Sequence, residues 1–73
     1  MPTRTSHRAE ACFNWRDRAP IGSLERQLFT DAAEEYLFAQ RLPSGNPEKI
    51  RCAMRARRLF VKALKISDQR HST

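Results

Sequence analysis

The stretch NPEKIRCAMRARRLFVKALKI, from Asn46 to Ile66, decides the fold of this 73-residue chain. Asn46 suits the N-cap of a helix, Pro47 fits the first helical position, and Glu48 complements the positive end of the helix dipole. Because no glycine or further proline follows within the stretch, it predicts one long helix over residues 47–66.

Five cations fall on one side of this predicted helix, because their spacing alternates between four and three residues. They are Arg51, Arg55, Arg58, Lys62 and Lys65. Apolar side chains fill an opposite arc of roughly 220°, whereas packing on one neighbouring helix needs little more than about 100°. We expect the surplus apolar surface to be covered by the N-terminal segment, by a second copy or by another molecule. Arg57 falls inside this arc, where we expect it to pair with Glu35 or to reach out to solvent.

The segment LERQLFTDAAEEYLFAQRL, residues 24–42, predicts another helix, with Ser23 as its N-cap and a proline after its end. Its polar side carries Asp31, Glu34 and Phe38. An aromatic side chain among charges on an exposed face is a candidate anchor for a protein partner. The alternative is an isolated exposed phenylalanine, which is common on protein surfaces.

The turn between the two predicted helices is short, which implies an antiparallel hairpin, and no strand pattern is present. The sequence therefore predicts an all-α fold: an antiparallel helical hairpin over residues 20–68, with an N-terminal segment packed across it. Residues 1–19 are expected to form a flexible, partly docked arm, with disorder over residues 1–6 and one or two helical turns from His7. Residues 69–73 are expected to be frayed.

The arm supplies three candidate contact residues, Arg8, Trp15 and Arg16. Large aromatic side chains usually become buried, so Trp15 and the nearby Phe13 are expected to dock on the hairpin. The alternative is that the arm becomes ordered when it binds a partner.

The net charge is +6, and eleven of the fourteen basic residues are arginine. Residues 43–73 carry eight basic side chains against two acidic ones, whereas residues 23–42 have a net negative charge. Such asymmetry indicates a polyanion, a membrane surface or an acidic protein as partner. A membrane is not expected, because the apolar side of the basic helix is better explained as core and no run approaches about 18 apolar residues.

Catalysis and metal binding have no support in the residue pattern. His7 and His71 lie near opposite ends of the chain, and the spacing of Cys12 and Cys52 is not that of a zinc site. Cys52 falls on the apolar arc and is expected to be a core thiol. No apolar leader precedes Arg18, so we expect a cytoplasmic protein with free thiols, without cofactor, metal or enzymatic activity.

The basic helix leaves a nucleic-acid-binding function open. A DNA-reading helix-turn-helix contacts bases through the first residues of its second helix, and Pro-Glu-Lys-Ile at 47–50 is poorly suited to reading bases. Phosphate contacts with a steep salt dependence need no such residues. A stand-alone basic nucleic-acid-binding helical protein is therefore the alternative to a protein-binding role.

The opening MPTRTSHRAEACFNWRDRAPIGS and the basic IRCAMRARRLFVKALK resemble the small RNA-polymerase-binding regulators of Xanthomonas bacteriophages. The likeness extends over the full length and involves no defined motif. It implies binding to bacterial RNA polymerase through the N-terminal part of the β′ subunit, near the RNA exit channel, in the cytoplasm of the infected host. It further implies inhibition of promoter-dependent initiation and antitermination alongside NusA and nascent RNA. It carries over no binding residues, and a monomer is expected, with a homodimer as the alternative.

Overall fold

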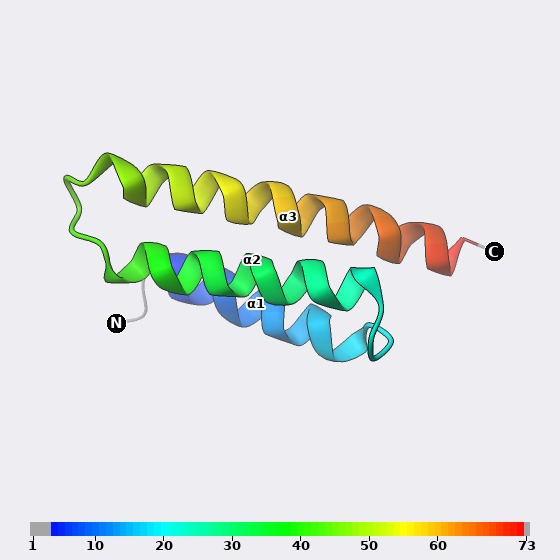
Figure 1. Ribbon diagram of the computed structural model, residues 1–73. Coiled ribbons are helices and arrows are strands. Elements are labelled where there is room, and N and C mark those ends of the chain that lie inside the picture. Colours follow the sequence, from blue (N-terminus) through cyan, green and yellow to red (C-terminus); the bar gives the residue numbers. More distant parts are fainter. Residues whose placement is uncertain (1–3, 73) are drawn as a thin grey trace.

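The computed structural model describes residues 4–72, which form three helices and no strand. Helices α1 (Arg4–Arg18), α2 (Leu24–Arg41) and α3 (Pro47–His71) run up, down and up, so that α2 is antiparallel to both of the others (Figure 1). The all-α fold with an antiparallel hairpin of α2 and α3 is confirmed. The molecule is elongated, with extents of 44 × 22 × 18 Å.

The predicted helix starts are confirmed by their capping contacts. The Ser23 hydroxyl accepts a hydrogen bond from the backbone N–H of Arg26, at 3.1 Å. The Asn46 side chain accepts one from the backbone N–H of Glu48, at 2.9 Å, and Pro47 occupies the first position of α3. Gly22 has a positive φ of 80°, which a glycine adopts without strain in the loop between α1 and α2.

Two helices are longer than the sequence pattern predicted. Instead of one or two turns from His7, α1 has 15 residues, because an apolar side containing Ala9 and Cys12 is buried in the core. Residues 4–6 belong to this helix, whereas residues 1–3 of the predicted disordered stretch lie outside the described residues. The expected fraying of residues 69–73 is wrong up to His71, where α3 ends.

The last turn of α3 is held by an ion pair that the sequence analysis did not find. Arg70 donates two hydrogen bonds to the carboxylate of Glu25, at 2.8 and 3.1 Å. Glu25 lies in the first turn of α2 and is only 2% exposed, although it is charged. Hydrogen bonds from Arg70 lower the pKa of Glu25 below its ordinary value of 4.5, against the opposing effect of burial. This pair joins the start of α2 to the end of α3.

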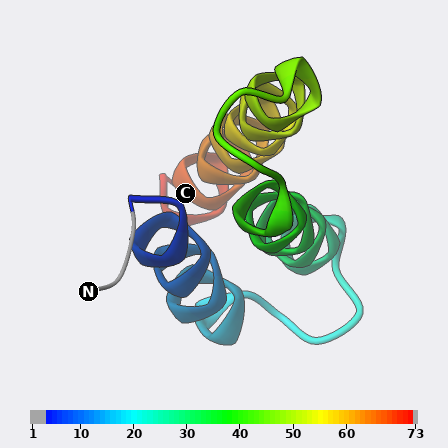
Figure 2. The same ribbon diagram turned by 90° about the vertical axis from the view of Figure 1, so that its left-hand side faces the viewer.

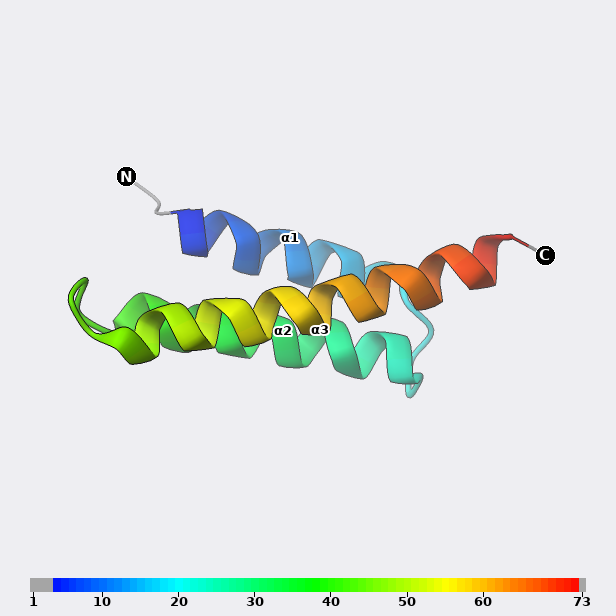
Figure 3. The same ribbon diagram turned by 90° about the horizontal axis from the view of Figure 1, so that it is seen from above.

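Helix α2 is the centre of the packing. It contacts both α1 and α3 extensively, whereas α1 and α3 scarcely touch each other (Figure 2). Seen from above, α3 covers α2 while α1 lies to one side of the pair (Figure 3). The N-terminal segment therefore packs on the hairpin mainly through one of its two helices.

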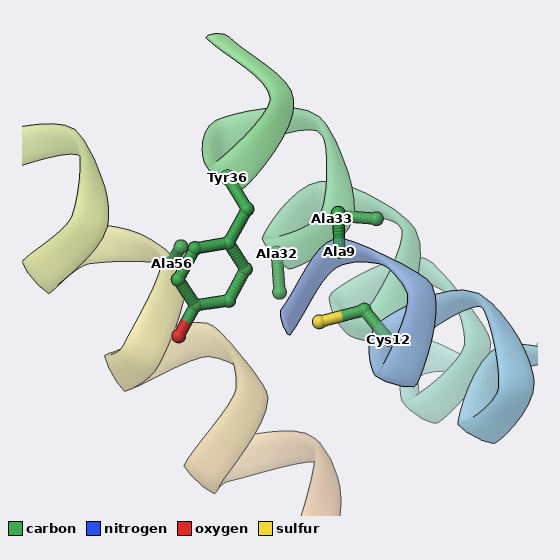
Figure 4. Packing of buried hydrophobic residues seen from close by; sticks show 6 residues of the cluster. All are labelled: Ala9, Cys12, Ala32, Ala33, Tyr36 and Ala56. Carbon is green, nitrogen blue, oxygen red and sulfur yellow. The ribbon is translucent and has the colours of Figure 1, made fainter. Parts of the chain in front are cut away.

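The core combines small side chains with a few aromatic rings. The fully buried alanines are Ala32, Ala33, Ala39, Ala56 and Ala63. In the middle of the molecule, the Tyr36 ring extends from α2 towards α3 beside Ala56, and Cys12 points its sulfur towards the same centre (Figure 4). Small side chains let the helices approach closely, while Leu24, Leu37 and Phe38 of α2 remain exposed.

In a second part of the core, three aromatic rings, one from each helix, pack together. Trp15 of α1 stacks on Phe29 of α2 with a centroid distance of 5.9 Å. The Phe29 ring meets Phe60 of α3 edge to face at 5.6 Å. Both arrangements are favourable for aromatic pairs. Trp15 thus connects the N-terminal helix to the hairpin.

Candidate functional site

The five cations predicted to form a stripe all lie exposed on α3, but neighbouring acids divide them into two groups. Arg51 pairs with Glu48 at 3.3 Å. Arg55 pairs with Glu48 at 3.1 Å and with Glu35 of α2 at 3.4 Å. The expected pairing of Glu35 with Arg57 is therefore wrong, and Arg57 instead points to solvent, which was the stated alternative. The first part of the stripe is largely neutralised by acids of the same molecule.

The remaining cations of α3 form what we call the cationic surface: Arg57, Arg58, Lys62 and Lys65. Within residues 4–72, none of these four makes an ion pair. They surround two exposed apolar side chains, Met54, which is 51% exposed, and Val61, which is 40% exposed. Together these side chains line a shallow hollow of about 410 Å³. The surface offers apolar contact at its centre and unneutralised positive charge around it.

The second predicted group, on α2, is brought together by the structure. Asp31, Glu34 and Phe38 line one hollow, which they share with Glu35 of α2 and Leu59 of α3. Phe38 is 51% exposed, and Asp31 accepts a hydrogen bond from the Gln27 side chain at 2.8 Å. We call this the acidic surface. It has the exposed aromatic ring among carboxylates that the helical periodicity predicted.

The three candidate residues of the N-terminal segment, Arg8, Trp15 and Arg16, do not lie together in one site. Arg8 and Trp15 line hollows between α1 and α3. The guanidinium of Arg16 instead lies over the Phe13 ring, 4.8 Å from its centroid, and pairs with Asp17 at 3.0 Å. Trp15 is partly buried and packs against the core, so only part of its surface is accessible.

Sequence reasoning missed several accessible residues beside the cationic stripe. Met54 and Val61 belong to the apolar arc of the basic helix, and part of that arc remains uncovered because α1 packs on α2. Arg18 was not selected at all, although it lies over the Trp15 ring at 5.3 Å from its centroid. The spacing of Arg8, Trp15 and Arg18 would have placed them on one helix face if a full helix had been predicted.

The chemistry of the two thiols fits a structural role. Cys12 and Cys52 are both free and completely buried, which confirms Cys52 as a core thiol. Burial raises the pKa of the Cys12 thiol to about 11 and also raises that of Cys52. Both are therefore protonated at neutral pH, and a protonated thiol is a poor nucleophile.

Two further features, a metal site and a membrane-spanning helix, are absent from the part of the chain that the structure describes. Residues 4–72 contain no group of three or more histidine, cysteine, aspartate or glutamate side chains placed to hold a metal ion. Among the same residues, no helix combines the length and the apolar character needed to cross a bilayer. Comparison with known proteins gave no match to a family model, to a curated protein or to a solved structure.

Proposed function

We propose that this protein is a phage-encoded, non-catalytic regulator that binds the RNA polymerase of its bacterial host. In this proposal it docks on the N-terminal region of the β′ subunit, near the RNA exit channel. There it inhibits promoter-dependent initiation and promotes transcription antitermination, with NusA and nascent RNA nearby. It acts as a monomer in the cytoplasm of the infected cell.

The observation that carries the proposal is the cationic surface of α3. Four cations without an ion pair in residues 4–72 surround Met54 and Val61, so binding a partner does not require the protein to break its own ion pairs there. Complementary charge accelerates association and fixes the orientation of two proteins, while buried apolar contacts supply much of the affinity. The likeness of the whole sequence to the phage regulators of polymerase supports the choice of partner.

The acidic surface supports a regulator that touches more than one molecule. Asp31, Glu34 and Phe38 line a hollow together with Leu59 of α3, and none of the four cations of the cationic surface lines that hollow. Carboxylates around an exposed ring suit a basic protein and repel nucleic acid. Two surfaces of opposite charge would allow a small adaptor to contact a protein and, at the same time, the nucleic acid that this protein binds.

The proposal is tested by mixing the purified protein with bacterial RNA polymerase and measuring the complex by size-exclusion chromatography and in single-round transcription. The double charge reversal Arg58→Glu/Lys62→Glu is expected to weaken the complex about 100-fold, because it places like charges against an acidic partner. Arg41→Glu, an exposed cation at the end of α2, is the control and should retain binding. Absence of a complex at micromolar concentration would refute the proposal.

A second candidate function is binding to free nucleic acid, and the same four unpaired cations favour it. If they contact phosphates, affinity for an oligonucleotide falls steeply with salt concentration, by a slope that follows the number of contacts. Gel shifts on duplex and single-stranded oligonucleotides across salt concentrations test this function. Unchanged affinity in Arg58→Glu/Lys62→Glu would eliminate it.

A further inference from the structure

A groove runs between α1 and α3, on the side of the molecule where the backbones of these two helices approach each other at very few points. Two hollows form it, of about 370 and 670 Å³, and Leu64 lines both. The floor consists of apolar and aromatic side chains from all three helices, including Cys12, Tyr36 and Phe60. Each hollow is open to solvent along one side, so the groove is accessible along its length.

Small and aliphatic side chains form the walls of the groove. Ala11 stands on the α1 side and Val61 on the α3 side, and Val61 is 40% exposed. A small residue such as Ala11 lets another backbone come close. Between α1 and α3 there is thus an apolar notch in which the three-helix arrangement leaves the place of a fourth helix unoccupied.

The charges along the groove are mostly positive. Arg8 on α1 and Arg57 on α3 line the first hollow, and Arg18 lines the second. No ion pair is formed by any of these three within residues 4–72. Asp68 is the one carboxylate among the residues that line the two hollows. An occupant of matching chemistry therefore has apolar side chains on one face and carboxylates on both flanks.

We propose that this groove docks an acidic amphipathic helix of a partner protein. The wall of α1 from Arg8 to Arg18 is about 15 Å long at 1.5 Å per residue, which corresponds to a partner helix of about three turns. An amphipathic helix laid into an apolar groove is a common mode of peptide recognition, read through residues one turn apart. The proposal goes beyond the function proposed above, because it does not depend on which protein supplies the helix.

Charge decides between the possible occupants. A second copy that met this groove with its own groove would bring Arg8, Arg18 and Arg57 of both molecules together, and such like-charge contacts are unfavourable. A nucleic acid would use the cations but would leave the apolar floor at Phe60 and Leu64 without matching contacts. The acidic amphipathic helix uses both features of the groove.

The chain contains its own reporter for this site, since Trp15 is its single tryptophan and lines the groove. The probe is a synthetic helix of about 14 residues, with leucines on one face and glutamates on its flanks, so that it spans about 21 Å. Its twin carries lysine in place of every glutamate. The glutamate helix is expected to change Trp15 fluorescence in a saturable manner and to bind at least about tenfold more tightly than the lysine helix.

Three variants test the cations along the groove and the apolar α1 wall separately. Arg8→Glu and Arg57→Glu are each expected to weaken binding of the glutamate helix about tenfold, whereas the control Arg41→Glu, which has the same charge change outside the groove, should not. Ala11→Gln adds bulk to the α1 wall without a charge, and it is also expected to weaken binding. Circular dichroism and urea unfolding establish that each variant retains the wild-type fold.

The proposal is overturned if both synthetic helices bind equally, if Trp15 fluorescence does not respond, or if Arg41→Glu weakens binding as much as Arg8→Glu. It is also overturned if a single-stranded RNA displaces the glutamate helix and gives the same fluorescence change, or if sedimentation shows a dimer that hides the groove. Polymerase binding is scored separately. Arg8 lines the groove and lies outside the cationic surface, whereas Arg58 and Lys62 lie in the cationic surface and outside the groove. Unchanged binding of the glutamate helix in Arg8→Glu overturns the groove proposal alone, and unchanged polymerase binding in Arg58→Glu/Lys62→Glu overturns the proposed function alone.

Discussion

The two halves of α3 carry similar cations in different electrostatic surroundings. In the first half, Arg51 and Arg55 already pair with Glu48, and Arg55 also pairs with Glu35. In the second half, the four cations of the cationic surface make no ion pair within residues 4–72, and Arg70 in the last turn pairs with the buried Glu25. Charge on a helix face is thus a poor guide to binding unless the acids on the neighbouring helix are known.

The first prediction compares the ion pairs at the two ends of α3. Glu25, which pairs with Arg70, is buried, whereas Glu48, which pairs with Arg51 and Arg55, is much more exposed. Glu25→Gln is expected to lower the free energy of unfolding by about 2 kcal/mol, because it removes a buried, doubly hydrogen-bonded carboxylate. Urea unfolding followed by Trp15 fluorescence measures the loss. Glu48→Gln, the matched change in an exposed pair, should leave the unfolding midpoint nearly unchanged. Equal losses in the two variants would show that the burial of Glu25 adds nothing.

The second prediction compares the two halves of α3 by removing two positive charges from each. Arg58→Gln/Lys62→Gln is expected to weaken the polymerase complex about tenfold, because both cations are available to an acidic partner. Arg51→Gln/Arg55→Gln should weaken it much less, since these arginines already interact with acids of the same chain. Titration of labelled protein with polymerase measures both. A reversed order would place the contact on the first half of α3.

The third prediction is a pH dependence of stability that originates at Glu25. Its folded-state pKa lies below the ordinary value of 4.5, so its ion pair contributes stability above about pH 4.5. This contribution is lost as the pH falls through the depressed pKa, because the protonated carboxyl no longer attracts Arg70. Urea unfolding between pH 7 and pH 2.5 should show that wild type loses more stability than Glu25→Gln. Parallel curves for the two proteins would contradict this assignment.

Much of the fold was predictable because its signals are local. Ser23, Asn46 and Pro47 mark helix starts through contacts within one turn of the chain, and the periodicity of α2 and α3 identified their buried sides. The length of α1 was not predictable in this way, because its buried side is visible only once its packing partner is known. Glu25 and Arg70 are 45 residues apart, so no local pattern connects them.

The candidate site was predictable only in part, for the same physical reason. Periodicity placed all five stripe cations on an exposed side of α3 and placed Phe38 among carboxylates, as the structure has them. It did not reveal that Glu35 of the other helix reaches Arg55. It also did not reveal that α1 packs on α2 and leaves Val61 accessible beside Arg57. Both facts depend on the relative placement of helices, which a single sequence does not encode locally.

The central claim is that the cationic surface of α3 binds polymerase. Hydrogen–deuterium exchange of the protein, alone and in complex with bacterial RNA polymerase, tests it most directly. We predict that complex formation slows amide exchange over residues 57–65, with a smaller change over residues 47–55. Protection confined to residues 47–55, or to the outer side of α2 around Phe38, would contradict the claim.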